Sequence, residues 1–264
     1  MGGLFAGLFF RKAGWDAQIF ERVGEPLNAR GAGIATHPEL FDSLKLVDID
    51  PEVPDFGILS PGRAVYARDG SCLCAAPIQQ VMTSWGRLYD LLRQKFGEDR
   101  YYASREFVRC QNRPGGVVAE FADGSTVEGD LLVAADGIYS AVRAQFEPSC
   151  QAVYAGYSAW RGLVPESAFS MEFRREIFEQ LAFCLPPGEQ CLGYPVAGEA
   201  NDMRAGFRRY NIVWYRPAEK QTELQRLLTD IDGHSNGISI APHRIRQDVI
   251  DDMRSDAKRL LAPQ

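Results

Sequence analysis

The chain has 264 residues, of which 45% are hydrophobic and 24% are charged. This composition is typical of a globular protein and excludes an intrinsically disordered chain, which lacks the apolar content needed to offset chain entropy. The formal net charge of -6 argues against a nucleic-acid backbone as the main partner, because such proteins carry basic patches.

The cysteines show no spacing typical of a metal site, and we expect reduced thiols of a cytoplasmic protein. The apolar residues 3–10 are too few to span a bilayer, and no positively charged segment precedes them. We therefore expect no membrane segment, no targeting signal and no metal site. The cysteines are Cys72, Cys74, Cys110, Cys150, Cys184 and Cys191.

The amino-terminal part predicts alternating helices and strands. Apolar residues first repeat at helical spacing, and Gly14 follows as a C-terminal stop. The predicted elements are a helix at 3–13, a strand at 15–21, a loop at 24–33 and a helix at 37–46 behind a Thr36 cap.

The middle of the chain predicts short antiparallel strands, a helix and one buried strand. The dense proline and glycine residues of 51–77 favour short strands. The continuous apolar run 131–135 is typical of a strand buried on both faces. The other predicted elements are a helix at 85–96, a meander at 106–111, 117–121 and 126–127, and a helix at 139–145.

Residues after 148 alternate aromatic and polar side chains between turns, as in an antiparallel sheet with one solvated face. The expected strand segments are 154–164, 172–185, 190–196 and 208–215, followed by helices at 219–231 and 242–261. The sequence therefore predicts an α/β fold in which an incomplete Rossmann-like domain with a parallel sheet is interleaved with an antiparallel-sheet domain. The first domain is expected at 1–53, 84–150 and 242–264, and the second at 54–83 and 151–241.

Two glycines and a glutamate form the first candidate site. Gly2 and Gly3 begin the first helix, whose free N–H groups and dipole favour an anion such as pyrophosphate. Glu21 ends the following strand, where an acidic residue accepts hydrogen bonds from a ribose. A purely structural role for these residues is the alternative interpretation.

The second candidate site is the Asp136-Gly137-x-x-Ser140-x-x-Arg143 element at the end of the predicted buried strand. Ligands of open α/β sheets bind beyond the carboxyl ends of strands. Asp136 can accept hydrogen bonds, Gly137 permits close backbone approach, and Arg143 supplies positive charge for phosphate. The alternative is a strand end capped by Asp136, with Arg143 on a solvated helix face.

These motifs together resemble those of the FAD-dependent aromatic hydroxylases. The element from Asp136 to Arg143, the strand ending in Glu21 and the loop Arg30-Gly31-Ala32-Gly33 all resemble that family's motifs. The segments 157–162 and 209–216 are most similar to its 2,6-dihydroxypyridine 3-hydroxylase branch. The resemblance covers essentially the whole chain.

The resemblance implies that a nicotinamide cofactor, NAD(P)H, reduces FAD, which then uses O2 to hydroxylate an electron-rich aromatic or N-heteroaromatic ring. It implies cofactor-binding roles for Gly2, Gly3, Glu21, Arg30, Asp136, Gly137 and Arg143. The expected partners are a small aromatic substrate and O2, and a homodimer is compatible with the resemblance. Aromatic residues on alternating strands more often belong to the core than to a substrate site. With that alternative, the candidate substrate residues are Tyr157, Trp160, Arg161, Tyr194, Tyr210 and Trp214. His37 is a candidate proton acceptor or a structural residue.

The sequence departs from the family pattern at both ends. Met1 stands inside the glycine fingerprint, and no Gly-Asp-Ala run follows residue 130. We therefore expect a chain that is truncated relative to the family and lacks the first strand of its parallel sheet. The rival interpretation is a non-catalytic gene fragment or remnant binding domain that no longer holds FAD.

Overall fold

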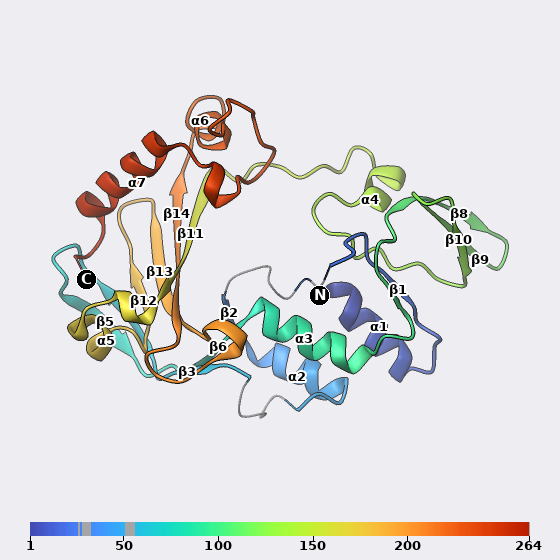
Figure 1. Ribbon diagram of the computed structural model, residues 1–264, viewed down its shortest axis with the longest axis horizontal. Helices are drawn as coiled ribbons and strands as arrows, with labels where there is room; N and C mark the ends of the chain where they lie inside the picture. Colours follow the sequence, from blue (N-terminus) through green and yellow to red (C-terminus); the bar gives the residue numbers. More distant parts are fainter. Residues whose placement is uncertain (26, 28–32, 51–55, 264) are drawn as a thin grey trace. The chain divides into compact units, whose positions relative to one another are not determined.

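The computed structural model of the chain describes residues 1–25, 27, 33–50 and 56–263 (Figure 1). The chain forms two compact units, each built from two separate segments. The first unit contains Met1–Phe56 and Ser84–Val153, and the second contains Gly57–Thr83 and Tyr154–Gln264. The predicted interleaving of an α/β part with an antiparallel part is therefore confirmed.

Helices α1 (Gly2–Lys12) and α3 (Trp85–Phe96) pack against each other in the first unit, together with β1 (Ile19–Phe20). Gly7 allows this approach: a Cβ atom at this position would lie 2.8 Å from the ring of Phe96. Both helices agree with the prediction to within a residue or two. The side chain of Ser84 caps α3 by accepting a hydrogen bond from the Arg87 N–H.

The strands of the first unit form a short parallel pair and a meander. β1 pairs in parallel with β7 (Tyr101–Tyr102). The predicted meander is confirmed as an antiparallel sheet of β8 (Phe107–Arg113), β9 (Gly116–Phe121) and β10 (Thr126–Gly129). The remaining elements are β2 (Gly33–Ala35), α2 (Pro38–Leu46) and α4 (Ala141–Phe146).

The predicted buried strand at 131–135 is wrong for this structure. These residues form no strand, and Leu131 and Val133 are 55% and 50% exposed. The physical reason is that apolar character alone cannot hold a strand. A strand buried on both faces needs a hydrogen-bonded neighbour on each side, and no ladder pairs these residues with any described strand.

The second unit is built on a six-stranded sheet in the order β11-β14-β13-β12-β4-β5 (Figure 1). Its pairs are antiparallel except for β12 with β4, which run parallel. The strands are β4 (Arg63–Tyr66), β5 (Cys72–Ala76), β11 (Tyr157–Pro165), β12 (Leu181–Cys184), β13 (Gln190–Val196) and β14 (Arg209–Pro217). Outside the six-stranded sheet, β3 (Ile58–Ser60) pairs antiparallel with β6 (Gln80–Ser84) in a three-stranded sheet of the order β2-β6-β3.

Helix α5 (Met171–Glu176) covers one face of this sheet. Its Phe173 packs in a buried cluster with Phe178, Ala182 and Tyr210. The prediction of a strand over residues 172–176 is wrong. The side chain of Ser170 caps a helical turn there by accepting a hydrogen bond from the Phe173 N–H.

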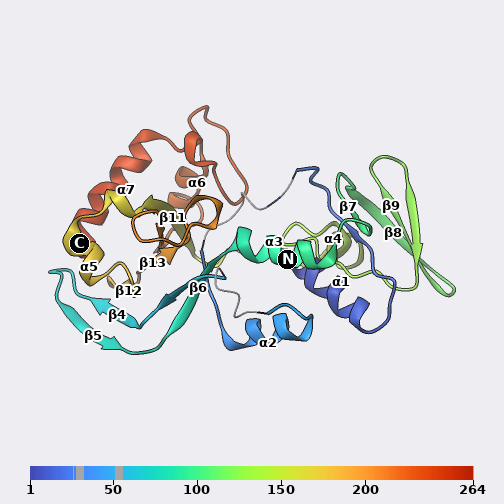
Figure 2. The same ribbon diagram turned by 60° about the horizontal axis from the view of Figure 1, so that its bottom comes forward.

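The carboxy-terminal helix α7 (Gln247–Leu260) belongs to the second unit by its contacts, whereas the sequence analysis placed 242–264 in the Rossmann-like domain. Two ion pairs explain the difference: Asp256 accepts from Arg216 of β14 at 2.7 Å, and Asp252 pairs with Arg226. Figure 2 shows α7 from a second direction. The limits of the functional domains otherwise stay a prediction.

Several predicted boundaries also shift. The N-cap of α2 is His37 rather than Thr36, and the His37 side chain makes no capping hydrogen bond. The predicted helix 219–231 is confined to α6 (Glu223–Leu228), and a 3-10 turn at Pro242–Arg244 precedes α7. Among the described residues, no helix combines the length and apolar character needed to cross a membrane.

Candidate functional site

The start of α1 lies against the segment that leads to Asp136. A Cβ atom at Gly3 would lie 3.5 Å from the Cβ atom of Ala135, and one at Gly2 would lie 3.9 Å from it. The N-cap residue Met1 makes no side-chain capping hydrogen bond to α1, and the first turn of the helix contains no acidic residue. The helix therefore presents N–H groups and the positive end of its dipole beside the Asp136 turn.

Glu21 is held near the same helix start. Its backbone N–H donates to the carbonyl of Tyr102 at 2.9 Å, which continues the β1–β7 ladder by one residue. Its Oε1 accepts from the N–H of Val23 at 3.0 Å. Burial lowers the pKa of the Met1 amino group, and the nearby Glu21 carboxylate partly offsets this effect. The first candidate site is therefore close to the second.

The Asp136–Gly137 turn is a preorganised loop that begins α4. Asp136 Oδ2 accepts hydrogen bonds from the N–H groups of Ala141 at 2.8 Å and Val142 at 3.3 Å. Burial raises the pKa of Asp136, but the hydrogen bonds from Ser140 and these amides outweigh it and leave the pKa below its usual value. Gly137 has φ +81°, which a residue with a side chain rarely adopts.

The Arg143 side chain forms hydrogen bonds with backbone carbonyls of its own loop. Its Nε donates to the carbonyl of Cys150 at 3.1 Å, and its Nη2 donates to the carbonyl of Ile138. Its backbone N–H donates to the hydroxyl of Ser140, the buried N-cap of α4. Arg143 thus shapes the turn that contains Asp136 and Gly137, a contribution that its charge alone did not indicate.

The structure brings together most of the predicted cofactor residues, all within the first unit. Arg30 lies outside the described residues. Ala135 was not among the predicted site residues, because its contribution is the close approach of its methyl group to Gly3, which no motif encodes. Ser140 could have been identified from its type and position, since serine is a preferred N-cap residue.

An apolar cavity of about 310 Å³ also lies in the first unit, between the meander and α4. None of the predicted cofactor residues that the structure describes lines it. Its walls include Cys110, Val117, Leu131, Leu132, Val142 and Phe146.

The predicted substrate residues separate onto the two faces of the large sheet. Residues paired across strands share a face, and Tyr210 and Trp214 point to the face that α5 covers, where both are buried. The indole N–H of Trp214 donates to Glu189 at 2.8 Å, so these two side chains belong to the core, and Trp160 shares their face.

The opposite face of the sheet carries Tyr157, Arg161 and Tyr194. Arg161 and Tyr157 are exposed there, whereas Tyr194 is buried. Burial raises the pKa of Tyr194 to about 12, against a smaller lowering effect of the Arg161 charge. This face therefore combines a fixed cation with an un-ionised phenol.

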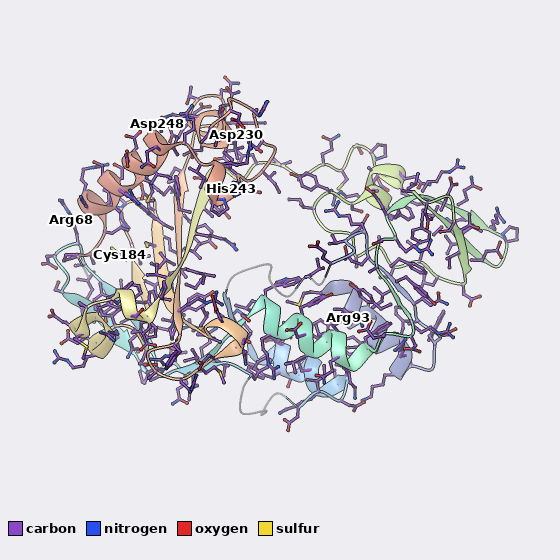
Figure 3. The ribbon with its side chains drawn as sticks, viewed as in Figure 1. Arg68, Arg93, Cys184, Asp230, His243 and Asp248 are labelled. Atoms are coloured by element: carbon purple, nitrogen blue, oxygen red, sulfur yellow. The ribbon has the colours of Figure 1, made fainter. Side chains whose placement is uncertain are left out.

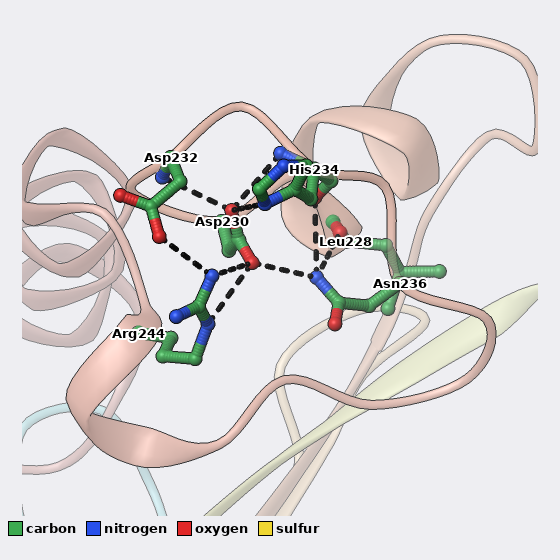
Figure 4. Close-up of polar contacts among 6 residues, drawn as sticks. All are labelled: Leu228, Asp230, Asp232, His234, Asn236 and Arg244. Carbon is green, nitrogen blue, oxygen red and sulfur yellow. Dashed lines mark hydrogen bonds and ion pairs between the residues drawn. The ribbon is translucent and has the colours of Figure 1, made fainter.

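A cluster of acidic residues in the second unit has a structural role. Asp230, Asp232 and His234 lie close enough to share a cation, but the Arg244 guanidinium donates to Asp230 at 2.6 and 3.1 Å and to Asp232 at 2.8 Å (Figure 4). Asp230 also accepts from the backbone N–H groups of Asp232 and His234, each at 3.0 Å. The cluster fixes the loop between α6 and α7.

The family model described as FAD binding domain-like matches residues 154–264. A crystal structure of 2,6-dihydroxypyridine-3-hydroxylase from Arthrobacter nicotinovorans superposes with a TM-score of 0.88 and 26% identity, covering 98% of this chain and 65% of that one. A variant of HpxO from Klebsiella pneumoniae complexed with FAD has a TM-score of 0.70 and 25% identity, covering 85% of this chain and 57% of that one. The fold is therefore that of the FAD-binding monooxygenases.

Sequence comparison identifies more specific relatives within the FAD-binding monooxygenases. The chain is 31% identical over 260 residues to 2,6-dihydroxypyridine 3-monooxygenase of Paenarthrobacter nicotinovorans, covering 94% of this chain and 62% of the relative. It is 29% identical over 262 residues to an FAD-dependent urate hydroxylase of Klebsiella pneumoniae, covering 83% of this chain and 63% of the relative. The chain is thus homologous to the FAD-dependent aromatic hydroxylases, as its motifs predicted. It spans less than two thirds of the length of these relatives.

Proposed function

We propose that this chain is the FAD-binding part of a monooxygenase that hydroxylates an electron-rich aromatic or N-heteroaromatic ring, with hydroxypyridines as the favoured substrate class. The observation that supports this most is the close approach of the α1 start at Gly3 to Ala135, directly before the Asp136 turn, within the unit that also holds Glu21. Homology to hydroxylases of dihydroxypyridine and urate supports the substrate class.

The residues present fit an FAD nucleotide. The first-turn N–H groups of α1 suit the pyrophosphate, since Gly2 and Gly3 put no side chain in front of them. Glu21 offers carboxylate oxygens to a ribose, and Gly137 provides a backbone surface without a Cβ. We assign Arg143 to positioning this turn. When bound, FAD reduced by NAD(P)H supplies the activated oxygen for the ring.

The face of the large sheet that carries Arg161 and Tyr194 is the proposed substrate surface. Arg161 can pair with the anionic form of a hydroxylated heterocycle, and the Tyr194 phenol can donate a hydrogen bond to it. We include a cytoplasmic location in the proposal, in keeping with the free cysteines, and a homodimer as the assembly to be tested.

The test is FAD binding to the purified chain, followed by flavin absorbance and fluorescence. Glu21→Gln removes a charge-assisted hydrogen bond of about 1.5–3 kcal/mol, so the Kd for FAD should rise about ten- to a hundredfold. The matched control is Glu25→Gln, which changes an exposed carboxylate four positions away. It should leave the Kd for FAD unchanged. The absence of FAD binding, or an equal effect of both substitutions, would refute the proposed cofactor site.

Activity is tested separately, by NAD(P)H oxidation and O2 consumption with 2,6-dihydroxypyridine and with urate. Arg161→Met should raise the KM for an anionic substrate while the Kd for FAD stays unchanged. A parallel change in both quantities would contradict the assignment of Arg161 to the substrate.

A further inference from the structure

Aromatic and thiol side chains form one row across the large sheet of the second unit. The pairing of the strands places them in the order Trp160, Trp214, Cys191, Cys184, Tyr66 and Cys72, from β11 to β5. Because directly opposed residues point to the same face, the side chains of Cys184 and Cys191 lie next to each other.

The two cysteines are at a separation that a disulfide can bridge. Directly opposed residues of antiparallel strands have Cα atoms about 4.5–5.5 Å apart, and disulfides join Cα atoms about 4.4–6.8 Å apart. No other described cysteine has this relationship: Cys72 is opposed by Tyr66, Cys74 by Val65 and Cys110 by Ala119, and Cys150 lies outside the strands.

Both thiols are free and half-buried. Cys184 is the last residue of β12, and the turn Leu185-Pro186-Pro187-Gly188 follows it. Figure 3 shows Cys184 in the sheet of the second unit. A small oxidant can therefore reach the end of the strand without unfolding of the sheet.

We propose that Cys184 and Cys191 are a redox modification site, at which hydrogen peroxide forms an intramolecular disulfide across the β12–β13 hairpin. In the first step the Cys184 sulfur attacks the peroxide, which gives a sulfenic acid and one water. In the second step the Cys191 sulfur attacks the Cys184 sulfur, and the hydroxyl leaves with the Cys191 proton as a second water. Two thiols lose two electrons, and the peroxide gains them.

The environment of the pair sets the order of these steps. Burial raises the pKa of the Cys191 thiol to about 12, and the neighbouring Cys184 sulfur adds to this effect. Cys191 is therefore mainly protonated at neutral pH, so we assign the first attack to Cys184, and loss of the Cys191 proton limits the rate of the second step. Oxidation should accelerate as the pH rises.

The test is peptide mapping of the full chain after treatment with hydrogen peroxide, alkylation of the remaining thiols and cleavage after glutamate. Cleavage at Glu179, Glu189 and Glu199 separates the two cysteines into peptides 180–189 and 190–199. We expect these peptides to appear linked, lighter by two hydrogen atoms than their sum, and to separate after reduction.

Cys184→Ser should abolish the linked peptide and leave Cys191 open to alkylation, whereas Cys72→Ser, a cysteine of the same row, should leave the link intact. Circular dichroism of each variant checks that the sheet is retained, and the map of the unchanged protein is decisive even if a variant fails to fold. Alkylation of both Cys184 and Cys191 after peroxide treatment would overturn the proposal. A Cys72–Cys74 link formed in preference would do the same.

Discussion

The strongest stability prediction concerns the buried ion pair of Arg208 with Glu166. The Arg208 side chain is only 9% exposed and donates to both Glu166 oxygens, at 2.9 and 3.0 Å. It also donates to both oxygens of Glu179, at 3.0 and 2.6 Å. Arg208→Met would remove the guanidinium donors from Glu166, whose side chain is 6% exposed, while the Gly206 N–H would still donate to its Oε2 at 2.8 Å.

Removing one partner of a buried pair costs about 3 kcal/mol or more, because the other charge stays buried without compensation. We therefore expect Arg208→Met to lower the free energy of unfolding of the second unit by about 3 kcal/mol. Replacing both partners, with Arg208→Met and Glu166→Leu, should recover much of this loss because apolar groups then fill the site.

The assay is urea unfolding, followed by circular dichroism, of the unchanged chain, both single variants and the double variant. The four values give a coupling energy between the two residues, which we expect to be about 2 kcal/mol. A single-variant loss below about 1 kcal/mol, or a double variant whose loss is the sum of the two, would refute the argument from burial.

Acid should also lower the free energy of unfolding of the second unit, because it protonates Glu166. Burial raises the pKa of Glu166, but the hydrogen bonds from Arg208 and the Gly206 N–H outweigh burial and leave the pKa lowered. A carboxylate with a lowered folded pKa stabilises the protein above its unfolded pKa. That stability is lost as the pH falls through the folded pKa, and Arg208→Met should remove this part of the acid dependence.

Two further predictions concern packing and a loop. A Cβ atom at Gly7 would lie 2.8 Å from the Phe96 ring, so Gly7→Val should lower the free energy of unfolding by about 1–3 kcal/mol. The control is Ala6→Val on the same helix. Equal shifts of the melting temperature in the two variants would contradict the packing argument. Asp230→Asn removes the charge that holds Arg244, so limited proteolysis should cut the loop after α6 faster, and an unchanged cleavage rate would show that the ion pair does not hold it.

Local patterns in the sequence were sufficient for elements that local interactions stabilise. The helix at 85–96 was predicted with its observed bounds because its apolar stripe lies within the segment itself. The meander was predicted because turns with glycines at positive φ, such as Gly115 and Gly124, connect its strands. In contrast, the apolar run 131–135 needed partner strands, and no pattern within the run specifies them.

The candidate site was predictable in part for the same reason. Glycine and acidic residues at fixed spacing pointed to the α1 start, Glu21 and the Asp136 turn, and the structure brings these together. The use of Arg143 within its own loop was not predictable, because it depends on the carbonyls of Ile138 and Cys150, which folding of the loop brings within reach. The division of the aromatic residues between two sheet faces became evident only from the strand register.

The interleaving of the two units constrains how the chain reaches its native state. β4 finds its parallel partner β12 only after the whole Ser84–Val153 segment of the other unit has been synthesised. Pairing between such distant segments is slow, since a long loop must close before the contacts form. During translation, the edge of β4 that later pairs with β12 therefore stays unpaired. Chaperone binding or aggregation at this edge would compete with assembly of the sheet. Expression at low temperature should favour the native product.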